Sequence, residues 1–269
     1  MRCWTPNKLR ALKGKKRFAT VTCYDATSAA LIEALGDTSD LPLVLVGDSL
    51  GMTMQGNDSP LPVTLDHMVY HTQCVARVLR TPMLIADMPF GSYQACDEDG
   101  FRNALRLIQE GGADGIKLEG GERCASLIHQ LVEAGIPVCG HLGLTPQSCL
   151  AMGGFKVQGR NPEAAQRLLH DAKILENAGC FSLVVEGVPA SLGKAVSEAL
   201  SIPVIGIGAG ADTDGQILVW QDLLGLNLGH VPKFARAFAC LGEQAIHGLR
   251  TYCAAVAEGT FPATSECYE

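Results

Sequence analysis

Short apolar runs recur along the chain and alternate with longer, more polar segments. The runs are rich in Val, Ile and Leu, and polar residues do not alternate within them, which is typical of parallel strands buried on both faces. Eight runs have this character, at residues 18–23, 43–47, 83–87, 115–119, 137–141, 181–186, 204–208 and 217–220. The pattern therefore predicts a sheet of parallel strands.

The segments between these runs predict helices that cover the strands. Amphipathic stretches lie at residues 99–110, 122–134, 163–178 and 192–200. Glycines follow three of them, at Gly111-Gly112, Gly135 and Gly179, where a left-handed helix cap favours glycine. Strand–helix alternation with eight candidate strands predicts an α/β fold, a (β/α)8 TIM barrel.

The repeat is not fully regular. The seventh and eighth runs lie too close together for a full helix between them, and a glycine-rich loop is expected at residues 151–160. No shift in composition marks a linker. We therefore expect one domain over residues 1–269, with a helical lead-in at 1–17 and a helical C-terminal segment at 229–269.

Composition narrows the function classes. Hydrophobic residues make up 47% of the chain, which is enough for a large core and argues against disorder. The net charge of -7 disfavours binding to nucleic-acid phosphates. No apolar run approaches the roughly 18 residues of a membrane span. We therefore expect small-molecule substrates and neither a nucleic-acid nor a membrane partner.

Cysteine usage and the basic N-terminus bear on location. The 11 cysteines are odd in number and include no C-x-x-C pair, which argues against zinc ribbons and iron–sulfur clusters and favours a reducing, cytoplasmic location. Basic residues cluster between Lys8 and Arg17. They could form a transit peptide or a polybasic patch, but no apolar segment of the signal type follows, and we favour a solvated first helix.

Side chains capable of chemistry stand at the carboxyl ends of the apolar runs. They are Asp48, Ser49, Asp87, Lys117, Glu119, His141 and Glu186. The carboxyl ends of parallel barrel strands open onto one face, where the active sites of such barrels are built. Solvated turn residues or helix N-caps could explain any one of them, but explain the whole set poorly.

This set favours a divalent cation and an oxo acid. Three carboxylates without a nearby Cys or His pair suit Mg²⁺, which could chelate the keto and carboxylate oxygens of a 2-oxo acid and act as a Lewis acid. Lys117 suits a substrate carboxylate. Glu186 ends an apolar run, and a partly buried carboxylate there suits a general base.

Other candidates carry weaker signals. His67 and His71 are four residues apart and could bind a metal, although the H-E-x-x-H pattern is absent. Residues 206–210 could form a phosphate cradle or a pocket wall. Cys139 could be a nucleophile or a packed thiol. The residue pairs 89–90 and 153–154 could shape the pocket or form ordinary turns.

Several blocks of sequence are specific enough to indicate a family. They are VGDSLGM (46–52), ADMPF (86–90), KLEGG (117–121), GHLGLTPQ (140–147), GGFKVQGR (153–160), residues 202–210 and DGQILV (214–219). From about residue 20 to the C-terminal region, the chain resembles the ketopantoate hydroxymethyltransferase (3-methyl-2-oxobutanoate hydroxymethyltransferase) family.

The resemblance implies a TIM barrel, usually a homodecamer, in pantothenate and coenzyme A biosynthesis. The reaction moves a hydroxymethyl group from 5,10-methylenetetrahydrofolate to 3-methyl-2-oxobutanoate, giving 2-dehydropantoate and tetrahydrofolate. The roles that the resemblance implies are as follows: Asp48, Asp87 and Glu119 for Mg²⁺ or another divalent ion, Asp48, Ser49, Asp87 and Lys117 for the oxo acid, His141 for the pocket lining and Glu186 for proton acceptance.

The sequence departs from the family pattern at two places. The segment at residues 36–42 looks longer than usual, and Gly187 stands where Cys is common.

Two rival functions remain. The segment Cys139-Gly140-His141 is also similar to isocitrate lyases, which keeps open a lyase or mutase acting on phosphoenolpyruvate or a related oxo acid. A non-catalytic oxo-acid sensor is the second rival, but it predicts a damaged catalytic set.

Overall fold

A computed structural model describes residues 2–36, 39–229 and 231–268 of the 269-residue chain. Eight parallel strands form a closed barrel in chain order, with β8 pairing back onto β1. The strands are β1 (Phe18–Thr22), β2 (Leu43–Val46), β3 (Met83–Asp87), β4 (Gly115–Glu119), β5 (Val138–Gly143), β6 (Ser182–Glu186), β7 (Val204–Ile207) and β8 (Gly215–Leu218). The predicted barrel is confirmed. Positions 37–38 of the longer segment at 36–42 lie outside the described residues.

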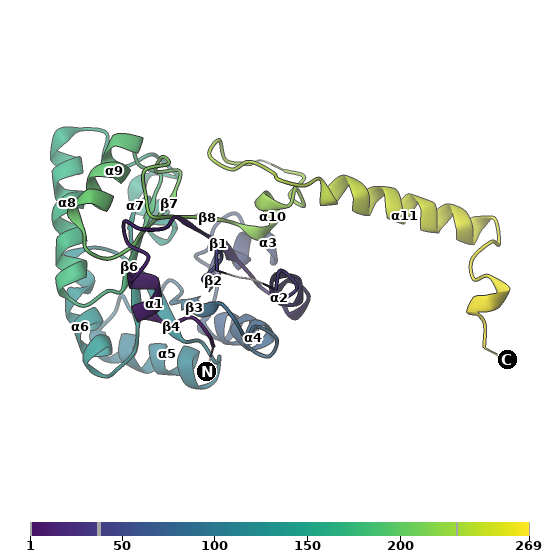
Figure 1. Ribbon diagram of the computed structural model, residues 1–269, viewed down its shortest axis with the longest axis horizontal. Coiled ribbons are helices and arrows are strands. Elements are labelled where there is room, and N and C mark those ends of the chain that lie inside the picture. The colour runs from purple at the N-terminus through teal and green to yellow at the C-terminus, as the bar shows by residue number, and fades with distance from the viewer. Residues whose placement is uncertain (1, 37–38, 230, 269) are drawn as a thin grey trace. The chain divides into compact units, whose positions relative to one another are not determined.

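Helices surround this barrel (Figure 1). In the barrel unit, Met1–Val219, they are α1 (Pro6–Arg10), α2 (Ala26–Glu33), α3 (Leu50–Thr53), α4 (Leu65–Ala76), α5 (Asp97–Gln109), η1 (Glu122–Cys124), α6 (Ala125–Glu133), η2 (Pro146–Ser148), α7 (Cys149–Met152), α8 (Pro162–Asn177) and α9 (Ala190–Ala199). A second compact unit, Trp220–Glu269, contains α10 (Trp220–Leu223), α11 (Leu241–Ala257) and η3 (Thr264–Glu266). Among the described helices, none is long and apolar enough to cross a membrane.

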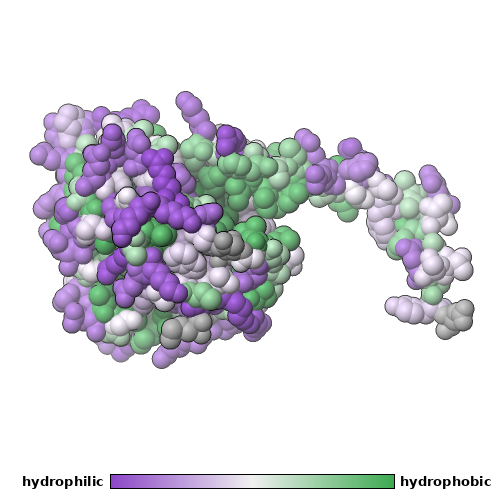
Figure 2. Space-filling view, in the orientation of Figure 1, coloured by the Kyte–Doolittle hydropathy of each residue, from purple (hydrophilic) through white to green (hydrophobic). Residues whose placement is uncertain are grey.

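Burial explains why the sequence forms these elements. Every residue of β3 and β4 is buried, as expected for strands covered on both faces. Helix α5 buries Gly100, Ala104 and Leu107 at helical spacing, and its outer face pairs Arg102 with Glu98. Polar side chains accordingly cover much of the visible outer surface of the barrel (Figure 2).

The connections also follow the sequence, with one correction. The glycines after α5, α6 and α8 have positive φ, as predicted, at 77° for Gly112, 86° for Gly135 and 106° for Gly179. No helix separates β7 from β8, since residues 208–214 form a loop. The last strand begins at Gly215, two residues before the predicted start at 217, because the pairing with β1 begins at Phe18 and Gly215. A longer side chain at Gly215 would collide with the ring of Phe18.

The basic lead-in closes the amino end of the barrel. Leu9 of α1 is buried in the barrel core beside Phe18 and Ile217, and Trp4 and Leu12 pack against the same cluster. The expected lead-in at 1–17 contains one short helix, α1. Its expected solvation is only partly correct, because Lys13 Nζ lies 2.7 Å from Asp214 Oδ2, in a contact largely shielded from water.

Asp214 connects the lead-in to the last strands. Its carboxylate accepts hydrogen bonds from the backbone N–H of Val204 (2.8 Å) and Gly14 (3.2 Å) and from Ser197 Oγ (3.1 Å). Burial alone would raise its pKa, but these bonds and Lys13 outweigh burial and lower it. The ionised carboxylate therefore stabilises the closed amino end of the barrel.

Replacing Asp214 should destabilise the fold. Asp214→Ala leaves buried donors and the Lys13 ammonium without their partner, so the free energy of unfolding should fall by about 3 kcal/mol in urea denaturation. The matched control is Asp212→Ala, because Asp212 has a 57% exposed side chain and only a 3.7 Å contact with Arg17. That change should stay within about 0.5 kcal/mol. Equal, small effects of the two substitutions would contradict this account.

Candidate active site

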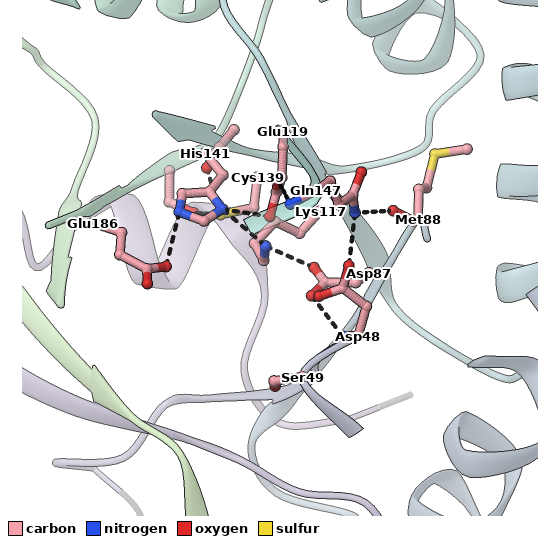
Figure 3. Close-up of polar contacts among 12 residues, drawn as sticks. Asp48, Ser49, Asp87, Met88, Lys117, Glu119, Cys139, His141, Gln147 and Glu186 are labelled. Atoms are coloured by element: carbon pink, nitrogen blue, oxygen red, sulfur yellow. Dashed lines mark hydrogen bonds and ion pairs between the residues drawn. The ribbon is translucent and has the colours of Figure 1, made fainter. Parts of the chain in front are cut away.

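The predicted polar side chains gather at the carboxyl ends of five neighbouring strands (Figure 3). Strand register brings them together, since Asp87 of β3 lies beside Lys117 of β4 and Glu119 of β4 lies beside His141 of β5. Lys117 and Glu119 are two residues apart, so both side chains lie on one side of β4. Contacts then run without a break from Asp48 to Glu186 at the end of β6.

Lys117 is the central cation of this site. Its ammonium lies 2.9 Å from Asp87 Oδ1 and 3.2 Å from His141 Nδ1, and the residue is only 5% exposed. Burial alone would lower its pKa. The neighbouring carboxylates, Asp87 first, outweigh burial and raise the pKa of Lys117, so the side chain stays charged.

His141 bridges two glutamates. Its Nδ1 lies 3.2 Å from Glu119 Oε1, and its Nε2 lies 3.3 Å from Glu186 Oε2. Burial and the charge of Lys117 lower its pKa, but the contacts with the two glutamates outweigh them and raise the pKa of His141 to about 9. The raised pKa favours the protonated ring, and its two nitrogens each face one glutamate.

Two further carboxylates, those of Asp48 and Asp87, lie side by side. The backbone N–H of Asp48 donates to Asp87 Oδ2 over 3.0 Å. Burial, followed by the charges of Asp87 and Glu119, raises the pKa of Asp48 well above its usual range. Burial also raises the pKa of Asp87, although Lys117 opposes the effect. Two buried acids that repel each other are stabilised in the ionised form by a cation.

Ser49 lies apart from this carboxylate network (Figure 3). Its hydroxyl shares a 2.8 Å hydrogen bond with Tyr24, whose side chain is fully buried. Gly47 makes room for this arrangement, because a Cβ at that position would lie 2.7 Å from Ser49 Oγ. Ser49 therefore flanks the carboxylates, held in place by a tyrosine that the sequence did not indicate.

The structure adds Gln147 and Tyr93 to the site. Gln147 Nε2 donates to Asp48 Oδ2 over 2.8 Å, and the Tyr93 hydroxyl lies 2.7 Å from Gln147 Oε1. Both residues are buried. Neither stands at a strand end, so strand-end reasoning could not find them. The only sequence signal was the position of Gln147 within the block at 140–147.

The donor set fits a divalent cation. Four acidic side chains, Asp48, Asp87, Glu119 and Glu186, face only two basic ones, Lys117 and His141. Asp87 Oδ1 is buried and has the Lys117 ion pair but no hydrogen bond of regular geometry. Mg²⁺ is commonly held by one or two carboxylates together with water and substrate. The fit is therefore strongest at Asp48 and Asp87.

Glu119 is engaged differently. Its Oε1 contacts His141, and its Oε2 accepts a 3.0 Å hydrogen bond from the backbone N–H of Gln147. Over the ranges that the structure describes, no group of three or more His, Cys, Asp or Glu side chains is arranged around one ion. A role for Glu119 in the metal site thus stays a prediction.

The weaker candidates have local structural partners. His67 closes a capping box with Thr64 at the start of α4, and His71 Nδ1 lies 2.7 Å from the carbonyl oxygen of Tyr24. The Cys139 thiol is buried and accepts a hydrogen bond from Ser182, and burial raises its pKa to about 11, which disfavours a nucleophile. In the loop at 206–210, Gln216 donates to the carbonyl oxygen of Gly210.

Comparison with known proteins identifies the family. The family model for ketopantoate hydroxymethyltransferase matches residues 4–264. The chain belongs to this family. It is 50% identical over 250 residues to the 3-methyl-2-oxobutanoate hydroxymethyltransferase of Heliobacterium modesticaldum, covering 93% of this chain and 89% of the relative. It is also 50% identical over 253 residues to that of Shewanella sediminis, covering 94% of each.

Solved structures support the fold. A phosphoenolpyruvate phosphomutase from Streptomyces platensis subsp. rosaceus superimposes with a TM-score of 0.60 at 12% identity, covering 94% of this chain and 88% of the other. At that identity the likeness shows a shared barrel architecture and carries no argument for mutase chemistry.

The family departure at Gly187 has a backbone basis, because Gly187 has φ of 56°, a conformation that suits glycine.

The His141 pKa should respond to its neighbours with defined signs. In metal-free protein, an NMR titration should show the imidazolium losing its proton near pH 9. Glu119→Gln should lower that pKa and Lys117→Met should raise it, because the first removes an attracting charge and the second a repelling one. Since the folded-state pKa exceeds that of the unfolded chain, this protonation stabilises the fold fully below about pH 6.5 and ceases as pH rises through 9. A neutral His141 at pH 7 would contradict the assignment.

Proposed function

We propose that this protein transfers a hydroxymethyl group from 5,10-methylenetetrahydrofolate to 3-methyl-2-oxobutanoate. Water is consumed, and 2-dehydropantoate and tetrahydrofolate are formed, as a step in pantothenate and coenzyme A synthesis. One observation carries the proposal: family membership at about half identity is accompanied by four acids at the carboxyl end of the barrel, three of them buried and Glu186 partly buried. A sensor without catalysis would not need that set.

The proposal includes a divalent cation, Mg²⁺ or a similar ion. Asp48 and Asp87 would hold it, with Glu119 as the third acid of the site. When bound, the ion supplies a Lewis acid that polarises the keto group and makes the neighbouring C3–H more acidic. Substrate binding and proton removal would be carried out by side chains of the protein.

The charged side chains would divide the work on the oxo acid. Lys117 offers a buried positive charge to the substrate carboxylate, and Ser49 and His141 flank it. Glu186 would accept the C3 proton, since it reaches the site from β6 and is held by the imidazolium of His141. The carbanion equivalent would then attack the methylene carbon of the folate, forming the new C–C bond as one of the two C–N bonds to that carbon breaks. Water would supply the hydroxyl as the second C–N bond breaks. The proton taken from C3 and one proton from water would go to the two folate nitrogens, so that tetrahydrofolate leaves.

The assembly and location form part of the proposal. We infer a homo-oligomer, a decamer as in the family, working in the cytoplasm. All 11 cysteines lie in the described ranges and are free thiols, which suits a reducing compartment. Five of them are buried and pack as small hydrophobic side chains.

Glu186→Gln should slow proton removal. Without folate, wild-type protein with Mg²⁺ should exchange the C3 hydrogen of 3-methyl-2-oxobutanoate for solvent deuterium, followed by NMR. The amide cannot accept the proton, so exchange and turnover should both fall by about 100-fold or more. Glu198→Gln, an exposed acid on α9, is the control and should exchange at the wild-type rate. Exchange by Glu186→Gln at an unchanged rate would refute the base assignment.

Asp87→Asn and Asp48→Asn should separate ion binding from folding. Each removes one negative charge from the proposed ion site while keeping the side-chain shape, so calorimetry should show oxo-acid binding that no longer depends on Mg²⁺ and is weaker by about 10-fold or more. Asp99→Asn on the exposed face of α5 is the matched control and should bind as wild type does. Unchanged, Mg²⁺-dependent affinity in both site variants would count against the metal role.

A further inference from the structure

Gln147 is a buried amide at the carboxyl end of the barrel to which the steps above assign no role. It lies in η2, after β5, and its side chain reaches across to the ends of β2 and β3. Figure 3 shows it between Asp48, Glu119 and the carbonyl group of Met88. Its side chain contacts Asp48 after β2, and its backbone N–H contacts Glu119 of β4.

All four hydrogen-bonding positions of this amide are used. Its Nε2 donates to Asp48 Oδ2 (2.8 Å) and to the carbonyl oxygen of Met88 (2.9 Å). Its Oε1 accepts from the Tyr93 hydroxyl (2.7 Å) and from Gln94 Nε2 (3.0 Å). A flipped amide would place its oxygen against the Asp48 carboxylate and the Met88 carbonyl. The network therefore allows one orientation only.

The same residue also holds Glu119. Its backbone N–H donates to Glu119 Oε2, and the Tyr93 hydroxyl that anchors the Gln147 amide also accepts the backbone N–H of Glu119 over 3.0 Å. Asp48 and Glu119 are thus fixed through one side chain and its own backbone. Because Gln147 is neutral, it does this without adding charge to a cluster that already carries excess negative charge.

We propose that Gln147 is the positioning residue of the carboxylate site. It holds Asp48 by Oδ2 and leaves Oδ1 of the same carboxylate available to a divalent cation, which Asp87 would also bind. This inference rests on the proposed function. Side chains that orient metal-binding groups typically alter ion affinity or activity by about 10- to 100-fold when they are removed.

The test measures Mn²⁺ binding to metal-free protein by calorimetry, in the presence of 3-methyl-2-oxobutanoate. Gln147→Met keeps the length and removes both amide groups, so its Mn²⁺ affinity should fall by about 10-fold or more. Tyr93→Phe removes only the hydroxyl that orients the amide and should give a smaller loss in the same direction. Gln166→Met, at an exposed amide on α8 outside this network, is the matched control and should change the affinity by less than about threefold.

A kinetic measurement separates positioning from general damage. For Gln147→Met, the Mn²⁺ concentration that gives half-maximal turnover should rise, and turnover at saturating Mn²⁺ should recover to within about threefold of wild type. If Gln147→Met does not fold, Tyr93→Phe carries the same test. Wild-type protein that fails to bind Mn²⁺ and oxo acid would overturn the proposed function and this inference together. Wild-type binding with unchanged affinity in Gln147→Met and Tyr93→Phe would overturn this inference alone.

Discussion

The site depends on charge compensation inside a barrel. Four acids and two cations share a space largely removed from water, where a pair of charges 4 Å apart interacts by about 4 kcal/mol at an effective dielectric constant of 20. A few such terms rival the total stability of a typical domain, about 5–15 kcal/mol. Lys117 and His141 offset much of the repulsion, and the remainder favours a divalent ion at Asp48 and Asp87.

The barrel holds these charges in place through strand register. Parallel pairing brings the end of each strand beside the next, so that single residues from β2 to β6 form one continuous set of contacts. The joint between β5 and β6 needs Gly143, which has φ of 93° and lies where any Cβ would collide with the carbonyl oxygen of Glu186. The position of the proposed base therefore depends on a glycine in the neighbouring strand.

Much of this arrangement could be predicted from the sequence. Strands buried on both faces form unbroken apolar runs, and the topology of a parallel barrel then places residues 48 to 186 at one end. Helix α2 is harder to predict, because its mainly small and apolar residues give little amphipathic contrast. Gln147 and Tyr93 lie in connecting segments, and their contacts depend on how those segments fold over the strands.

Ion pairs between residues far apart in the chain could not be predicted from the sequence. The basic residues of the lead-in gave no indication that Lys13 would find Asp214, 201 positions away, because nothing local encodes the pairing. Only the closure of the barrel brings the two together. The positions of Asp48, Asp87 and Glu186 were easier to predict, since each is fixed by a strand end rather than by a partner.

The lead-in makes the two ends of the barrel chemically different. Leu9, Trp4 and Leu12 fill the amino end of the barrel, and packed side chains occupy the interior above them. The barrel is therefore divided along its axis: apolar packing fills the amino end, and the charged side chains are confined to the carboxyl end.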